Sequence, residues 1–156
     1  MFRITAIAVA VTASLGLASQ AVAKPVAYSG KTSGGNPISF ERSGNTVKRV
    51  SAYIPATCVS AWPGYPPRSG DELFAPPGRL ALGREVSKTA LQDAALHHSE
   101  VTKNYRFAAR KGARGAISGR LHVNYSFQTL GYTTSYVLIG YVCRGDATFK
   151  ARPVRR

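Results

Sequence analysis

Short runs in which apolar and polar residues alternate, separated by glycine, proline and asparagine, dominate the chain beyond residue 24. The clearest run is 116–128, where Leu121, Val123, Tyr125 and Phe127 alternate with polar residues. Successive side chains of a strand point to opposite faces of a sheet, so this spacing predicts a strand with one face in the core. Strands are predicted over 26–32, 37–42, 46–54, 104–109, 116–128, 132–143 and 147–153.

Turn residues separate these runs, at 33–36, 43–45, 110–115, 129–131 and 144–146. Successive hairpins without long helices favour an all-β fold, either an antiparallel sandwich or an antiparallel barrel. In the run 46–54, Val50, Ala52 and Ile54 are expected on the buried face, with Lys48 at its start.

Two segments depart from this alternation. Residues 55–78 are rich in proline, which has no N–H to donate to a ladder, so an ordered loop or irregular edge is expected there. Residues 86–98 place apolar side chains at helical spacing and predict one short helix laid over the sheet. The residues on its buried side are Val86, Ala90, Leu91, Ala94, Ala95 and His98.

The first 23 residues have the layout of a secretory signal peptide. Arg3 supplies a positive start, residues 4–17 are almost wholly apolar or small, and Ala21-Val22-Ala23 is a small-x-small cleavage pattern. The apolar run is too short to span a bilayer, and no later segment is apolar enough to cross one. We therefore predict a signal peptide at 1–23, a single domain at 24–156, and a secreted or cell-envelope location.

The chain has two cysteines, Cys58 and Cys143. Export places them in an oxidising compartment, so a structural disulfide is expected between them. In the chain-entropy model, closing a loop of this length stabilises a fold by about 4–5 kcal/mol. The pairing leaves no thiol for catalysis.

Charge is the most unusual bulk property. The sequence has 21 lysines and arginines against 7 acidic residues. Loss of Arg3 with the signal peptide leaves a net charge of about +13, which attracts polyanions over long range. Outside a cell the candidate partners are anionic envelope polymers, lipid head groups and extracellular nucleic acid, unless the charge only keeps the protein in solution.

The strongest local signal is a basic segment without acids at 103–120, with aromatic residues interleaved. Its basic residues are Lys103, Arg106, Arg110, Lys111, Arg114 and Arg120. Guanidinium groups hold phosphate or carboxylate in bidentate fashion, and aromatic rings stack on bases or sugars. The predicted ligand-binding residues are Arg106, Arg110, Lys111 and Arg114, with Tyr105; the alternative is an ordinary solvated hairpin at 110–114.

Two other functions remain open. Arg120 and His122 share one strand face, and with Glu100 upstream they are the residue types of a small secreted phosphodiesterase or ribonuclease. Trp62 and Tyr65, in a proline-rich stretch at 62–67, suit a protein inhibitor or effector that presents a loop. No G-x-S-x-G motif occurs, and Asp71-Glu72 is interpreted as a solvated turn.

A metal site at His97 and His98, with Asp93 and Glu100, is disfavoured. Adjacent residues on a helix point about 100° apart, so both histidines rarely reach one ion. We expect no metal, no cofactor and no catalysis, and a protein that binds an anionic partner at or outside the cell surface.

Two stretches resemble a group of small exported bacterial proteins. They are Tyr-Ser-Gly-Lys-Thr-Ser-Gly-Gly-Asn-Pro-Ile-Ser-Phe at 28–40 and Gly-Ala-Ile-Ser-Gly-Arg-Leu at 115–121, followed by a late cysteine and a short basic strand. The resemblance implies an all-β fold, a signal peptide and a cysteine pair. It implies no particular chemistry.

Overall fold

The computed structural model describes residues 24–95, 99–132 and 136–154, so the expected signal peptide, His97 and His98 lie outside the described residues. The described residues form nine antiparallel strands and one short 3-10 helix, η1 (Ala113–Gly115). The strands are β1 (Val26–Thr32), β2 (Pro37–Ser43), β3 (Thr46–Ser60), β4 (Arg68–Phe74), β5 (Arg79–Ala81), β6 (Glu85–Ala94), β7 (Ser99–Lys111), β8 (Ile117–Tyr132) and β9 (Tyr136–Pro153). The predicted all-β fold is confirmed.

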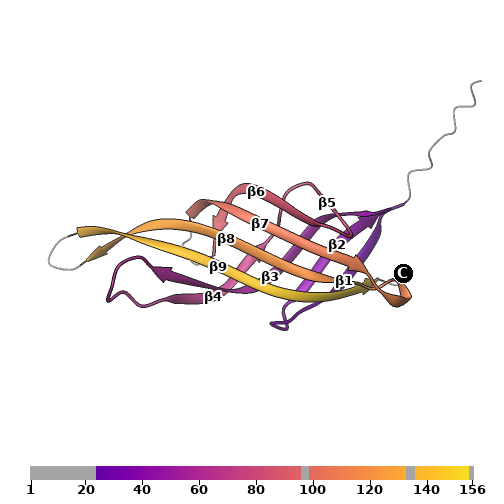
Figure 1. Ribbon diagram of the computed structural model, residues 1–156, viewed down its shortest axis with the longest axis horizontal. Coiled ribbons are helices and arrows are strands. Elements are labelled where there is room, and N and C mark those ends of the chain that lie inside the picture. Colours follow the sequence, from indigo (N-terminus) through magenta and orange to yellow (C-terminus); the bar gives the residue numbers. More distant parts are fainter. Residues whose placement is uncertain (1–23, 96–98, 133–135, 155–156) are drawn as a thin grey trace, which may run out of the picture.

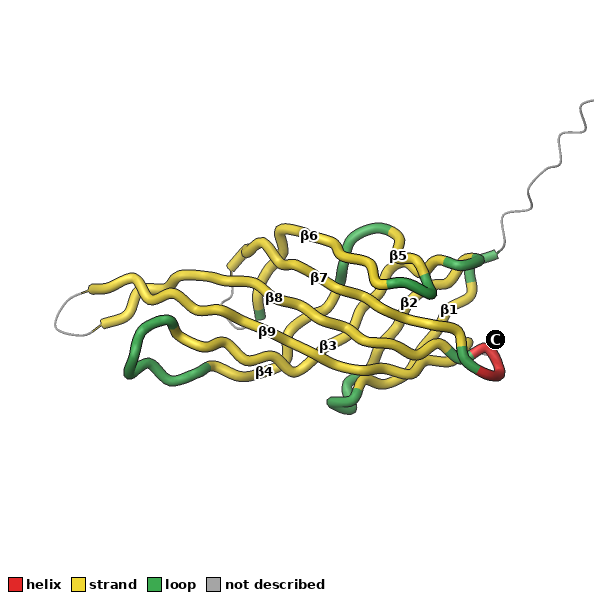
Figure 2. The backbone as a smooth tube through the Cα atoms, in the orientation of Figure 1, coloured by secondary structure: helices red, strands yellow, loops and turns green. Residues whose placement is uncertain are grey.

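The sheet runs in the order β4-β3-β2-β1-β9-β8-β7-β6, with β5 beside β3. Strand β9 pairs with β8 along nearly its whole length, while its other edge pairs first with β3 and then with β1. The β1–β2 hairpin therefore fills the space where β3 and β9 diverge. The result is an elongated molecule with the β3–β4 loop and the far end of β8–β9 at one end, and η1 at the other (Figures 1 and 2).

The sheet curls until its two ends approach each other. Gln92 of β6 donates a hydrogen bond to the carbonyl of Ala75, just beyond β4, and Glu72 of β4 reaches Lys103 of β7. One core fills the interior, and the alternation of β8 supplies much of it, because Leu121, Val123, Tyr125 and Phe127 are all buried.

The predicted disulfide is confirmed. Cys58 and Cys143 lie directly opposite each other on β3 and β9, with their Cα atoms 3.9 Å apart. The disulfide joins the two long strands at the middle of their direct pairing, which runs between 56–60 and 141–145.

The predicted buried face of β3 is wrong at the start of the strand, because the strand contains a bulge. The register with β2 shifts between Ser39 and Glu41, and Arg49 on β3 has a φ of 53°. At this point β3 has one residue more than β2, so the alternation between buried and exposed side chains is reversed before the bulge. Val47 therefore shares the buried face with Val50, and Lys48 is only partly buried.

The predicted helix at 86–98 is wrong over its described part. Residues 85–94 form β6 and pair with β7 over ten consecutive positions. Leu91, expected on the buried side of a helix, is 61% exposed. The alanines and Leu91 favour a helix intrinsically, but the ladder with β7 overrides that weak preference.

The irregular segment and two of the turns also need correction. Residues 129–131 and 144–146 lie within β8 and β9, and parts of 55–78 belong to β3 and β4. Gly145 lets two backbones approach, since a Cβ there would lie 3.1 Å from the carbonyl oxygen of Pro55. One edge of β3 pairs with β2 as far as Ala52 and with β9 from Ala56 onward. Pro55 lies between these two paired stretches, so its missing N–H interrupts no pairing on that edge.

Candidate anion-binding surface

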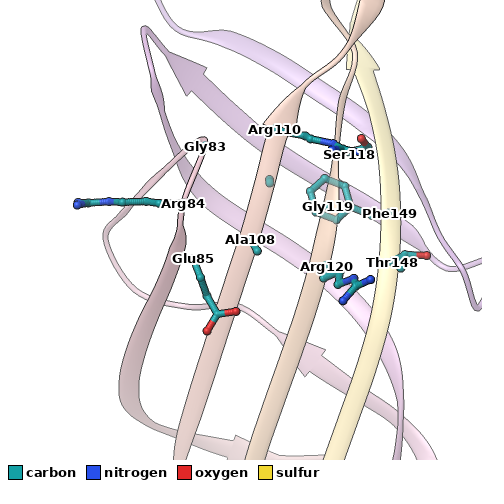
Figure 3. Close-up of a pocket in the computed structure, with 11 residues that line it drawn as sticks. Gly83, Arg84, Glu85, Ala108, Arg110, Ser118, Gly119, Arg120, Thr148 and Phe149 are labelled. Carbon is teal, nitrogen blue, oxygen red and sulfur yellow. The ribbon is translucent and has the colours of Figure 1, made fainter.

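A shallow depression lies on the outer face of β6 to β9, toward the η1 end. Its volume is about 600 Å³, and small residues, including Ala108, Ser118, Gly119 and Thr148, form its floor. The charged residues that line this depression are Arg110, Arg120, Arg84 and Glu85. Figure 3 shows Arg110 and Arg120 beside the floor, whereas the side chain of Arg84 extends away from it.

A second depression of about 550 Å³ continues along the same face. It shares Glu85, Ala108 and Arg120 with the first. It adds Arg106, His122, Asn124, Arg144 and Asp146. We call the two depressions together the outer groove. The described residues that line it include five arginines and two acidic residues.

Strand register explains why these side chains meet. Arg106 of β7 lies opposite His122 of β8, which lies opposite Asp146 of β9. Residues directly opposite on neighbouring strands point to the same face of the sheet and have Cβ atoms about 5 Å apart. Residues 40 positions apart in the sequence are thereby placed in one row across the groove.

One of the two carboxylates is neutralised within the groove. An oxygen of Asp146 lies 2.7 Å from Nδ1 of His122, and Nε of Arg144 donates to the other oxygen at 2.7 Å. Burial pushes the pKa of Asp146 upward, but the hydrogen bonds from Arg144 and His122 outweigh it and hold the pKa below its usual value. Asp146 therefore stays ionised and positions the His122 ring.

The predicted ligand-binding residues divide into three groups. Arg106 and Arg110 line the outer groove. Lys111 and Arg114 are exposed at the β7–β8 tip, where Arg114 has a φ of 53°. Tyr105 is buried and donates a hydrogen bond to Gln92, so the prediction that its ring is available for stacking is wrong.

The predicted catalytic set is only partly brought together. Arg120 and His122 share the outer face of β8 as expected. Glu100 lies on β7 six residues before Arg106, the residue opposite His122, which is about 20 Å along an extended strand. Asp146 instead provides the carboxylate at His122, and it was missed because 144–146 was predicted to be a turn.

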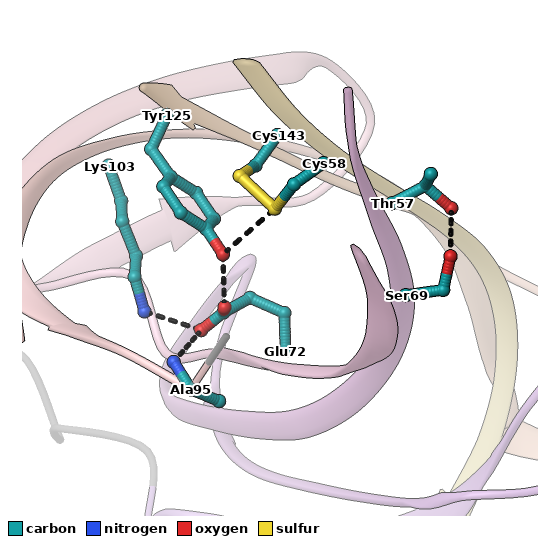
Figure 4. The surroundings of a disulfide bond; sticks show 8 residues. All are labelled: Thr57, Cys58, Ser69, Glu72, Ala95, Lys103, Tyr125 and Cys143. Atoms are coloured by element: carbon teal, nitrogen blue, oxygen red, sulfur yellow. Dashed lines mark hydrogen bonds and ion pairs between the residues drawn. A yellow bond between two sulfur atoms is a disulfide. The ribbon is translucent and has the colours of Figure 1, made fainter. Parts of the chain in front are cut away.

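The interior holds a second polar cluster that the sequence did not reveal. Lys103, Glu72, Tyr125 and the disulfide lie together beneath the sheet (Figure 4). The ammonium of Lys103 lies 2.7 Å from Glu72, and both side chains are fully buried. The interpretations of Lys103 as part of a basic surface and of Glu72 as part of a solvated turn are therefore wrong.

The proline-rich loop at 62–67 lies at the opposite end of the molecule from η1 (Figure 1). Trp62 is half exposed, whereas Tyr65 packs against the core. A role for this loop in an inhibitor or effector stays a prediction.

Comparisons of the chain with protein-family models, with curated proteins and with solved structures find no match. Within the described ranges, no helix is both long and apolar enough to cross a membrane. The same part of the chain contains no cluster of three or more histidine, cysteine or acidic side chains suited to a metal ion.

Proposed function

We propose that this protein binds an anionic partner at or outside the cell surface, and that the outer groove is the binding surface. One observation carries the proposal: five arginines line a continuous groove in which one of two carboxylates is already paired. The excess of positive charge in the whole chain would steer such a partner toward the protein.

The floor and the rim of the groove suit different parts of an anionic ligand. Ala108, Gly119 and Thr148 leave room for a ligand backbone to approach the sheet. Arg110 and Arg120 lie on neighbouring strands at diagonal positions, because Arg110 is opposite Ser118 and Ala108 is opposite Arg120. Guanidinium groups so placed form paired, charge-assisted hydrogen bonds to phosphate, sulfate or carboxylate oxygens.

An extracytoplasmic setting is supported by the disulfide and by the expected signal peptide. The Cys58–Cys143 bond is of the kind that persists in oxidising compartments. The proposal therefore concerns partners outside the cytoplasm.

Retention of the disulfide-intact protein on a heparin column tests the proposal. We expect strong retention that weakens steeply with salt. The variant Arg110→Gln/Arg120→Gln should elute at much lower salt than the variant Arg68→Gln/Arg79→Gln. The control removes the same charge from exposed residues of β4 and β5, away from the groove.

Equal elution of the two double variants would show that net charge alone causes retention and would contradict the proposal. A third variant, Lys111→Gln/Arg114→Gln, measures the contribution of the β7–β8 tip. If that variant alone loses retention, the tip and not the groove is the binding surface.

A second candidate function rests on the His122–Asp146 pair. With Nδ1 directed at Asp146, the Nε2 atom of His122 is left for proton transfer beside Arg106 and Arg120. Such an arrangement suits cleavage of a phosphodiester held by the arginines. Incubation of the protein with labelled RNA at several pH values tests it: cleavage lost in His122→Ala supports hydrolysis, and intact RNA throughout excludes it.

A further inference from the structure

Exposed apolar side chains gather at the end of the molecule opposite η1. Among the described residues, five of the nine exposed large apolar side chains lie there. They are Val59, Trp62, Leu130, Leu138 and Val142, and we call them the apolar end. The loop that carries Trp62 begins beside β9, since the N–H of Ala61 donates a hydrogen bond to the carbonyl of Gly140, and it lies toward the same end as the start of β9 in Figure 1.

Strand pairing makes part of this set contiguous. Leu130 lies directly opposite Leu138 in the β8–β9 ladder, and Val59 lies directly opposite Val142 in the β3–β9 ladder. Leu138 and Val142 are on the outer face of β9, because Ile139 and Tyr141 between them are buried. The Gln128–Gly140 pair lies between these two apolar pairs on the same face. Exposed apolar side chains gathered in this way often mark an interaction site.

The apolar end continues into the outer groove. Val142 also lines the groove, and Arg144 follows two residues later on the same face of β9. Arg144 thus places a positive side chain beside the apolar residues on the outer face of β9.

We propose that the apolar end inserts into the interfacial layer of an anionic lipid bilayer while the arginines of the outer groove hold the lipid head groups. This inference rests on the proposed function and names its partner as a membrane surface. Exposed leucines and a tryptophan enter the boundary between head groups and acyl chains, and nearby arginines add electrostatic attraction to anionic lipids. Tryptophan in particular is enriched at that boundary.

Other occupants fit the same surface less well. A polysaccharide or nucleic acid in the groove would engage the arginines but leave Leu130 and Leu138 in water. A second copy of this chain would bring two strongly basic faces together, and like charges in contact are costly. An anionic bilayer supplies both a negative surface and an apolar layer beneath it.

Co-sedimentation with vesicles tests the proposal. The disulfide-intact protein should bind vesicles of phosphatidylcholine mixed with phosphatidylglycerol, and bind phosphatidylcholine alone at least tenfold more weakly. Leu130→Ser/Leu138→Ser should weaken binding to the mixed vesicles at least tenfold while leaving heparin retention unchanged. The control Val26→Ser/Val154→Ser alters two exposed apolar residues near η1, where Pro153 lies beside Gly115 and Val154 donates a hydrogen bond to Ala27, and it should bind like the unaltered protein.

Trp62 is the only tryptophan and reports directly on insertion. Its emission should shift to shorter wavelength when mixed vesicles are added, and brominated acyl chains should quench it. No shift, or equal vesicle binding by Leu130→Ser/Leu138→Ser, would overturn the lipid inference. The lipid inference would also be overturned if the unaltered protein did not bind vesicles but formed a dimer in solution that Leu130→Ser/Leu138→Ser dissociates.

The two proposals fail separately. Heparin retention that depends on Arg110 and Arg120, without any vesicle binding, keeps the proposed function and removes the lipid inference. If Arg110→Gln/Arg120→Gln changes neither heparin retention nor vesicle binding, the outer groove is not the binding surface. The lipid inference, which depends on it, is then wrong as well.

Discussion

Lys103 and Glu72 form an ion pair of 2.7 Å inside the protein, and neither side chain has any solvent exposure. Glu72 accepts further hydrogen bonds from the Tyr125 hydroxyl at 2.6 Å and from the backbone N–H groups of Leu73 and Ala95. The Lys103 ammonium also donates to the carbonyl oxygen of Asp93. The carboxylate is therefore well satisfied, and the pair ties β4 to β7, which are far apart in the sheet order.

Removing one partner of this pair should be far more damaging than removing both charges. Lys103→Met leaves a buried carboxylate without its cation, so we expect a loss of about 3–5 kcal/mol in the free energy of unfolding. Lys103→Met/Glu72→Gln removes both charges and keeps an acceptor for Tyr125, so it should recover much of that loss. Urea unfolding of the disulfide-intact protein measures both.

Lys111→Met is the matched control, because Lys111 is exposed on the same strand. It should change stability by no more than about 0.5 kcal/mol. If Lys103→Met proves as mild as Lys111→Met, the ion pair does not hold β4 against β7.

The same cluster predicts an unusual alkaline titration. Burial raises the pKa of Tyr125, and the hydrogen bond to Glu72 and the charge of Glu72 raise it further. Burial, with the nearby charge of Glu72, also raises the pKa of Tyr105. Ultraviolet titration should therefore find that Tyr105 and Tyr125 keep their protons at pH values well above the ordinary tyrosine value of about 10.

The effect on stability has a definite sign. The two phenols keep their protons better in the folded than in the unfolded chain, so their contribution is fully present below the ordinary value of about 10. It is lost as the pH rises above that value toward the higher folded pKa. Tyr125→Phe/Tyr105→Phe should remove the tyrosine absorbance change seen at the highest pH, and an absorbance change of the same size there would contradict the assignment to these two residues.

The sequence was most informative where side chains alternate regularly. The predicted strand at 26–32 matches β1, and the run of buried residues in 116–128 matches β8. Alternation is a local property, so it can be recognised without knowing which strands pair. It failed at Arg49, where one extra residue in a bulge reverses the faces. It also failed at 86–94, where Val86, Ala90 and Ala94 are four residues apart, a spacing that places them on one side of a helix and also on one face of a strand.

The candidate site depended on information that a local pattern does not contain. Arg106 and Arg110 could be selected from their charge alone, and both line the outer groove. Asp146 beside His122 follows from the β8–β9 register, and Glu72 beside Lys103 follows from the curl of the whole sheet. A basic residue that is exposed and one that is buried in an ion pair look alike in sequence, which is why Lys103 was misplaced.

Gly119 lies on the floor of the outer groove. A Cβ at this position would lie 2.1 Å from the carbonyl oxygen of Ala108 and 2.8 Å from the Cα of Ala109, so β7 and β8 pack together only because residue 119 has no side chain. Gly119→Ala should cost about 1–3 kcal/mol of stability, as other overpacked sites do, and should weaken heparin retention by distorting the floor. Gly112→Ala is the control, since its added Cβ would meet nothing closer than 3.7 Å and should change stability by under about 0.5 kcal/mol. Thermal or urea unfolding compares the two alanine variants, and equal stability would mean that the close β7–β8 approach at Gly119 is not required for the fold.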